Sequence, residues 1–345
     1  MEEGKKQRKA GKLQIALILF SVVFLVFYLY REEGIYAVPL LFRWDYALML
    51  FLASLCIVIS WLAEAAVLYV TMRSAPVRIR YGTAVRICMI GLYFNTVTPL
   101  ATGGQPSQAY QLHKRGISYA EAVSGLFSKF LTYQVTYTIY CAVVLLMRFS
   151  SLRASLGNLV YMALAGFAMQ IVVTLGLLSM AFFKRGTTRA ALLLLAAGAK
   201  LRILKKPEEK KEKLLEEIDA FHERSREVFR HKRRLLVSFA MTLVQLSAFY
   251  TVGYVLYRCF ARDGGTDFFT VISSQVFITL ISSVVPLPGA VGAAEGSFYY
   301  FFQMYFPSSV LSLVMILWRF LTFYLPLFVG LLMTISWKSG KKRQR

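Results

Sequence analysis

Two long apolar stretches of this chain are each interrupted in the middle by prolines and glycines. The first interruption reads FNTVTPLATGGQP, at residues 94–106, and the second reads SVVPLPGAVGAAEG, at residues 283–296. A membrane helix does not pass smoothly through such a segment, because proline lacks the backbone N–H that the helix needs and glycine weakens it. Broken apolar segments at corresponding positions in two halves of a chain indicate the binding site of a transporter.

The remaining sequence is apolar enough to place these segments in a membrane. Of the 345 residues, 57% are hydrophobic, and several runs reach the about 20 apolar residues that cross a bilayer. The net charge of +22 would suit nucleic acid, but the basic residues flank the apolar runs. That position is typical of cytoplasmic loops beside anionic lipid headgroups. We therefore expect an all-α polytopic membrane protein that binds no nucleic acid.

Six apolar runs are expected to cross the membrane completely. They lie at residues 13–30, 46–70, 120–147, 156–183, 235–257 and 308–337. Basic clusters precede the first run and follow the last, which places both termini in the cytoplasm. The sequence thus predicts a multi-pass protein of a cytoplasmic (plasma) membrane.

The two interrupted segments do not fit this alternation of spans. Residues 87–112 have basic residues on both flanks, so the segment is expected to start and end on the cytoplasmic side. Residues 283–306 precede a span that must begin outside, because its far end is basic. We expect two re-entrant elements that enter from opposite faces, in the manner of an inverted repeat.

This pattern divides the chain into two membrane halves and a linker. The first half is residues 1–199, with its re-entrant segment at 87–112, and the second is residues 235–345, with its re-entrant segment at 283–306. Residues 200–234 are hydrophilic, with apolar side chains at helical spacing. An amphipathic helix on the cytoplasmic surface and a solvated linker both fit that pattern.

Four ionisable residues inside the apolar segments are candidates for function, because charge is costly in a bilayer. They are Glu64, Lys129, Glu295 and Arg319. Two acids and two bases in one helical bundle suggest pairing. A ligand site and purely structural ion pairs are both consistent with this composition.

Uncharged polar groups gather in the first interrupted segment. Asn95, Thr98 and Gln105 could bond to a lipid headgroup, or they could satisfy backbone groups that the break exposes. The N–H groups of Gly103 and Gly104 could form a nest that binds an anion.

One face of the third span is also polar. Lys129, Tyr133 and Tyr137 are spaced four residues apart and share a helix face. They could line a polar cavity, and simple aromatic packing is the alternative.

Motifs for nucleotide, metal or nucleophile chemistry are missing from the sequence. It contains no Walker A motif and no Gly-x-Ser-x-Gly motif, and its histidines and cysteines have no metal-ligand spacing. We expect no cofactor, no metal and no catalytic residue.

The stretch GLYFNTVTPLATGG at residues 91–104, followed by QPS, and the stretch PLPGAVGAAEG at residues 286–296 resemble one known family. This is the membrane region of bacterial lysylphosphatidylglycerol synthase/flippase proteins, and the resemblance covers residues 13–337. It implies a domain of the bacterial plasma membrane that moves phospholipid, such as aminoacylated phosphatidylglycerol, between leaflets. The implied partners are membrane phospholipid and a second copy in a homodimer, and a separate synthase is a further possible partner.

The chain departs from the two-domain members because it ends soon after the last expected span, without their soluble aminoacyltransferase domain. We therefore expect a lipid flippase rather than an enzyme, with Lys129 or Arg319 holding a lipid phosphate and Glu64 or Glu295 meeting a cationic headgroup. Two alternatives stay open. One is a membrane transferase of the phosphatidylglycerol lysyltransferase type, and the other is a non-transporting scaffold that docks an enzyme through residues 200–234.

Overall fold

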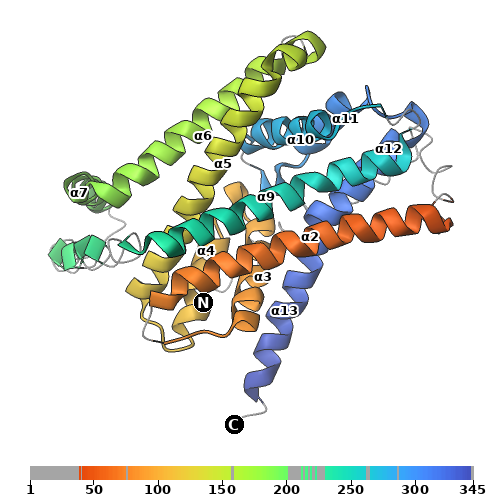
Figure 1. Cartoon of the computed structure of the whole chain (residues 1–345). Coiled ribbons are helices and arrows are strands. Elements are labelled where there is room, and N and C mark those ends of the chain that lie inside the picture. Colours follow the sequence, from red (N-terminus) through yellow and green to blue (C-terminus); the bar gives the residue numbers. More distant parts are fainter. Residues whose placement is uncertain are drawn as a thin grey trace.

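The computed structural model describes residues 39, 41–74, 77–156, 159–200, 231–261, 265–285 and 287–342, together with isolated residues between 211 and 230. Within these ranges the chain forms helices joined by turns, and no strand is present (Figure 1). This confirms the all-α fold. The helices are α2 (Trp44–Thr71), α3 (Tyr81–Val97), α4 (Gly104–His113), α5 (Tyr119–Leu156), α6 (Leu159–Phe182), α7 (Lys184–Lys200), α9 (Lys232–Phe260), α10 (Phe268–Ser283), α11 (Ala293–Phe302), α12 (Ser308–Arg319) and α13 (Leu325–Lys342).

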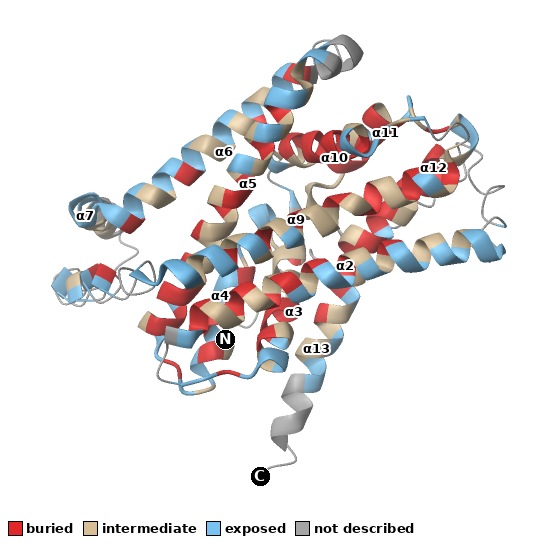
Figure 2. Ribbon diagram, in the orientation of Figure 1, coloured by how far each residue is buried: buried red, intermediate tan, exposed pale blue. Residues whose placement is uncertain are grey.

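Five helical segments in the described part of the chain are long and apolar enough to cross a membrane. They are α2, α5, α6, α9 and the α12–α13 pair, and they coincide with five of the six predicted spans. The sixth, residues 13–30, lies outside the described residues. Outer helices expose apolar side chains, such as Val172 at 68% and Leu332 at 66%, while α10 to α12 are largely buried (Figure 2). Such an apolar exterior is expected of a multi-pass membrane protein.

Each interrupted segment folds into a helical hairpin. In the first, α3 and α4 pack against each other on either side of the turn η3 (Pro99–Ala101). In the second, α10 and α11 pack against each other on either side of η4 (Pro288–Ala290). The hairpins span residues 81–113 and 268–302, so both begin earlier than the predicted segments 87–112 and 283–306.

The two hairpin turns follow the same backbone path. In each, an extended residue precedes a proline, as the bulk of the proline ring requires. The residue after the proline is left-handed in both turns, Leu100 with φ of 51° and Gly289 with φ of 62°. Ala101 and Ala290 continue in the same region, with φ of 52° and 48°. The turns η3 and η4 also contact each other, so the two hairpins meet at their tips.

The same order of elements occurs twice along the chain. A long helix, a hairpin and a second long helix appear as α2 to α5 and again as α9 to α13, and α4 and α11 are both 10 residues long. The long helices α2 and α9 form the most extensive helix contact among the described elements. They run in opposite directions (Figure 1), which is the arrangement expected of an inverted repeat. The membrane faces from which the hairpins enter stay predictions.

The last predicted span is distorted where its proline lies. Between α12 and α13 the residues Phe320–Tyr324 form a π-helical turn, in which the N–H of Leu325 bonds to the carbonyl of Phe320. Pro326 follows directly and has no N–H to offer the carbonyl of Thr322, so the regular helical bonding is interrupted here. The distortion begins immediately after Arg319.

An ion pair between the end of the α5 span and the start of α10 joins the two halves of the chain. The helix α5 continues to Leu156, beyond the predicted end of its span at residue 147, and includes Arg148. Its guanidinium contacts Asp267, which caps the N-terminus of α10 by accepting from the N–H of Thr270. Partial burial raises the pKa of Asp267, but the bonds from Thr270 and the charge of Arg148 outweigh this and hold it below its ordinary value.

Most of the predicted linker, residues 200–234, lies outside the described residues. Within its described part, Ile218 is buried and the carboxylate of Asp219 pairs with Lys184 of α7 at 2.8 Å. This segment therefore contacts the first half of the chain. Its role as a boundary between two halves stays a prediction.

Candidate functional site

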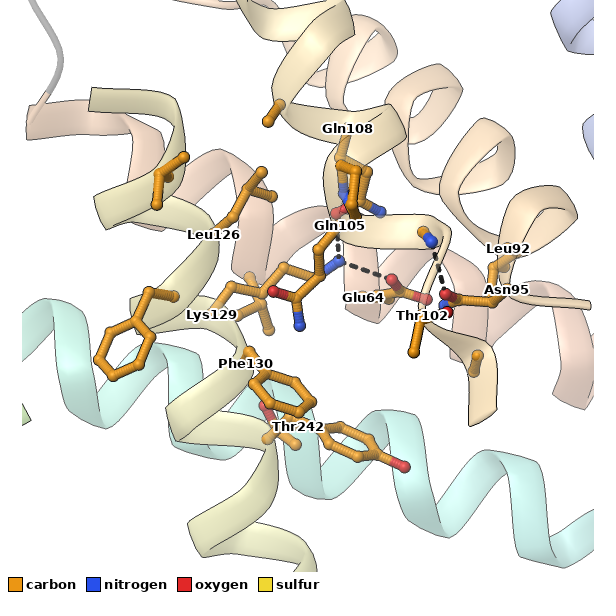
Figure 3. A pocket seen from close by; sticks show the side chains of 18 of the residues that line it. Glu64, Leu92, Asn95, Thr102, Gln105, Gln108, Leu126, Lys129, Phe130 and Thr242 are labelled. Atoms are coloured by element: carbon orange, nitrogen blue, oxygen red, sulfur yellow. Dashed lines mark hydrogen bonds and ion pairs between the residues drawn. The ribbon is translucent and has the colours of Figure 1, made fainter. Parts of the chain in front are cut away.

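A cavity of about 870 Å³ lies beside the first hairpin (Figure 3). Residues of α2, α3, η3, α4, α5 and α9 form its wall, and its lining is mainly apolar with a cluster of polar groups. Six of the predicted site residues line it: Glu64, Asn95, Gly104, Gln105, Lys129 and Tyr133. The fold thus brings together residues of α2, of the first hairpin and of α5.

The centre of the cavity wall is an ion pair between α5 and α2. Lys129 Nζ lies 2.6 Å from Glu64 Oε1, and their side chains are 13% and 12% exposed. Lys129 also approaches Gln108 Oε1 of α4 at 3.5 Å and the sulfur of Cys88 at 3.6 Å. Removing one partner of a buried ion pair costs about 3–5 kcal/mol, because the other charge is left unpaired. A ligand that separates this pair must therefore compensate both charges.

Close contact between the two arms of the hairpin aims Gln108 at Lys129. A Cβ atom on Gly91 of α3 would lie only 2.2 Å from Gln108 Nε2, so no larger residue fits there without displacing the amide. Glycine at this position lets α3 and α4 approach. The amide oxygen of Gln108 on α4 lies 3.5 Å from the ammonium group of Lys129 on the neighbouring helix α5 (Figure 3).

The polar residues of the turn satisfy the broken backbone. Asn95 Oδ1 accepts from the N–H of Gly104 at 2.8 Å, and Thr98 Oγ1 accepts from the N–H of Gly103 at 2.9 Å. These bonds supply partners to N–H groups at the start of α4. Both N–H groups of the predicted anion nest are thus occupied in this conformation. Contact of Asn95 and Thr98 with a headgroup, and binding of an anion at Gly103 and Gly104, stay predictions.

The other two predicted ionisable residues, Glu295 and Arg319, pair with each other and do not line the cavity. Arg319 Nε of α12 is 2.6 Å from Glu295 Oε1 of α11, and the side chains are only 6% and 4% exposed. Arg319 also donates to the carbonyl of Gly289 in η4 at 3.0 Å. The second oxygen of Glu295 accepts from the N–H of Gly292 at 2.7 Å. The pair therefore joins the helix after the second hairpin to the hairpin's own turn.

Some residues of the cavity were not selected from the sequence. Thr242 and Gln245 of α9 line it, and their spacing of three residues inside an apolar span was an available signal. Gln108 was one of several polar residues in its segment, and only the hairpin packing distinguishes it. Nothing in the sequence indicated that Cys88 would lie next to Lys129.

The cavity combines groups suited to an amphipathic ligand. An ammonium can bind a phosphate oxygen, a carboxylate can bind an amine, and Leu126 and Phe130 provide apolar wall. Among the described residues, no group of three or more His, Cys, Asp or Glu could hold a metal ion.

These features define a polytopic, all-helical membrane protein with two hairpins of broken helices and a charged internal cavity. The chain belongs to the family described as the lysylphosphatidylglycerol synthase TM region, whose sequence model matches residues 13–330. It is also 23% identical over 315 residues to a UPF0104 membrane protein of Archaeoglobus fulgidus, a match that covers 91% of this chain and 93% of that protein. The predicted family is confirmed, and it is compatible with a role in membrane lipid biology.

Proposed function

We propose that this chain is a lipid flippase that moves a phospholipid between the two leaflets without ATP. The observation that supports this most directly is the cavity of about 870 Å³ with the Lys129–Glu64 pair in its wall. A phospholipid headgroup combines a phosphodiester with polar or charged substituents, and its chains are apolar. The mixed lining of this cavity matches that combination.

The ion pair suggests which headgroups would enter most easily. A phosphodiester that binds Lys129 displaces the carboxylate of Glu64, which then needs a new cationic partner. A headgroup with one phosphate and one or more amines supplies both partners. Aminoacylated phosphatidylglycerol has this chemistry, so it is the lipid that we propose as the first candidate.

Translocation would use the paired hairpins. The basic flanks favour cytoplasmic termini, with the first hairpin entering from the inside and the second from the outside of a bacterial plasma membrane. Because the turns η3 and η4 touch, opening of one hairpin would alter the contacts of the other. Such coupling is what alternating access requires.

The proposal is tested by lipid translocation in proteoliposomes with fluorescent and aminoacylated phospholipids. The double variant Glu64→Gln with Lys129→Met removes both charges and leaves no unpaired buried charge, so it should fold. We expect its translocation rate to fall at least tenfold. The matched control, Asp45→Asn with Arg43→Met, removes an ion pair whose two side chains are each 62% exposed. It should keep the wild-type rate. Wild-type translocation by the Glu64/Lys129 variant would refute the site.

The two alternative functions predict different results when the same purified protein is assayed. Wild-type protein that moves no lipid, but transfers lysine from aminoacyl-tRNA to phosphatidylglycerol, would be a transferase. Protein that does neither, and copurifies with a lipid-modifying enzyme only while residues 200–234 are present, would be a scaffold.

A further inference from the structure

Two similar five-residue segments occur in the chain, one in each repeat. Residues 129–133 read KFLTY, and residues 319–323 read RFLTF. The first begins 30 residues after Pro99, and the second begins 31 residues after Pro288, the prolines of the two hairpin turns. Each segment lies on the long helix that follows its hairpin. Sequence and fold therefore place Lys129 and Arg319 at equivalent positions.

The two segments share one side-chain hydrogen bond, although the first lies within the regular helix α5 and the second runs from the end of α12 into the π-helical turn. Thr132 Oγ1 donates to the carbonyl of Ser128 at 2.9 Å, and Thr322 Oγ1 donates to the carbonyl of Trp318 at 2.7 Å. Leu131 and Leu321 are both buried. The two segments thus share residue types, this threonine bond and the burial of the leucine.

Each equivalent base is paired with an acid, but the acid comes from a different element. Lys129 pairs with Glu64 of the long helix α2, and Arg319 pairs with Glu295 of the hairpin helix α11, both at 2.6 Å. Each base also contacts its own hairpin: Lys129 approaches Gln108 of α4, and Arg319 bonds to the carbonyl of Gly289 in η4. The repeat has therefore kept a hairpin-bound cation in both halves.

The two sites differ in whether they are open. The Lys129 site borders the large cavity, with Tyr133 in its wall. At the second site the equivalent ring, Phe323, lies against Arg319 with 5.0 Å between the guanidinium carbon and the ring centroid. Phe323 also covers the turn, since a Cβ atom on Gly289 would lie 1.9 Å from the ring. One cation is thus accessible and the other is enclosed by aromatic side chains.

The contact between the turns η3 and η4 connects the open Lys129 site to the closed Arg319 site. Leu100 and Ala101 of η3 line the open cavity, whereas η4 is held by Arg319. Because η3 and η4 pack on each other, a shift of one turn changes the support of the other. Packed contacts of this kind favour two discrete arrangements over a continuous range.

From these observations we propose that Arg319 and Glu295 form a second headgroup site, closed in this conformation, which binds the same lipid phosphodiester when the Lys129 site closes. This inference rests on the proposed flippase function. Release of Arg319 is feasible because Glu295 would keep its bond from the N–H of Gly292, in the first turn of α11 where the helix dipole favours a carboxylate. The freed guanidinium can then bind a phosphodiester with two parallel hydrogen bonds.

The double variant Glu295→Gln with Arg319→Met separates a binding role from a structural one. It removes both charges, so no buried charge is left unpaired and the protein should fold. We expect translocation to fall at least tenfold, while lipid binding at the open Lys129 site stays within twofold of the wild type. Binding is measured with a fluorescent short-chain phospholipid in detergent. Wild-type translocation would show that the pair is only structural, and loss of lipid binding together with translocation would show that it supports the first site; either result overturns the proposal.

Two further arms complete the test. The control Asp45→Asn with Arg43→Met carries the same type of substitution outside the sites and should translocate lipid normally. Excess inorganic phosphate should leave translocation within twofold, and strong inhibition by it would mean a site for free phosphate instead of a lipid. Absence of translocation by the wild type refutes the flippase function itself, whereas normal translocation by the Glu295/Arg319 variant refutes the second site alone.

Discussion

At the scale of the residue, the two hairpin turns place different residue types at the same left-handed backbone position. Leu100 holds a left-handed conformation that costs a non-glycine residue about 1–2 kcal/mol, whereas Gly289 adopts it without that penalty. We predict that Leu100→Gly leaves the melting temperature in detergent unchanged or raises it. Gly289→Ala should lower it clearly, since the new Cβ would lie 1.9 Å from the ring of Phe323. A loss of stability in Leu100→Gly as large as that in Gly289→Ala would contradict the shared turn geometry.

Single residues also show how far the sequence predicted the site. The cost of burying charge was enough to select Glu64 and Lys129, and they lie 2.6 Å apart in the cavity wall. Gln108 could not be selected in the same way, because its contact depends on the close approach of two helices at Gly91. The similar segments KFLTY and RFLTF were visible in the sequence. A match of five residues is too short to show equivalence until the fold places both segments on corresponding helices.

At the scale of the element, close contacts between helices depend on particular glycines, and the sequence alone does not show which glycines face another helix. In α6, a Cβ atom on Gly166 would lie 2.3 Å from the carbonyl oxygen of Leu280 in α10, while a Cβ atom on Gly176 of the same helix would meet nothing within 4 Å. We predict that Gly166→Ala destabilises the protein by about 1–3 kcal/mol, because the two helices must separate. Gly176→Ala should be neutral or stabilising by up to about 1 kcal/mol. Thermal unfolding of both variants in one detergent checks the difference, and equal effects would refute this helix contact.

The elements themselves were predictable where length and polarity decide. Five apolar runs of span length became helices of nearly the expected bounds. The beginning of the second hairpin was misplaced, because residues 268–283 contain no proline or glycine and only the turn at Pro288 shows where that helix folds back. The helix α5 runs on to Leu156, beyond the predicted span end at residue 147, and Arg148 in this extension contacts Asp267.

At the scale of the whole molecule, the repeat makes a prediction about topology. Lys114 and Gln303 are the C-terminal capping residues of the equivalent helices α4 and α11, and both are exposed. If the repeat is inverted in the membrane, the ends of the two hairpins lie on opposite faces. Basic residues around Lys114 place that end inside. We therefore expect Gln303→Cys to react with a membrane-impermeant maleimide in intact cells, and Lys114→Cys to react only in inside-out vesicles.

The native cysteines allow this labelling experiment with few changes. Cys88 and Cys141 are buried and can stay, while the half-buried Cys56 and Cys259 are replaced by alanine to remove background labelling. Translocation by the altered background must match the wild type before either label is interpreted. Labelling of both introduced cysteines from one face would mean that the hairpins are parallel in the membrane. The Lys129 and Arg319 sites could not then face opposite leaflets, and the alternation proposed for them would fail together with the inverted topology.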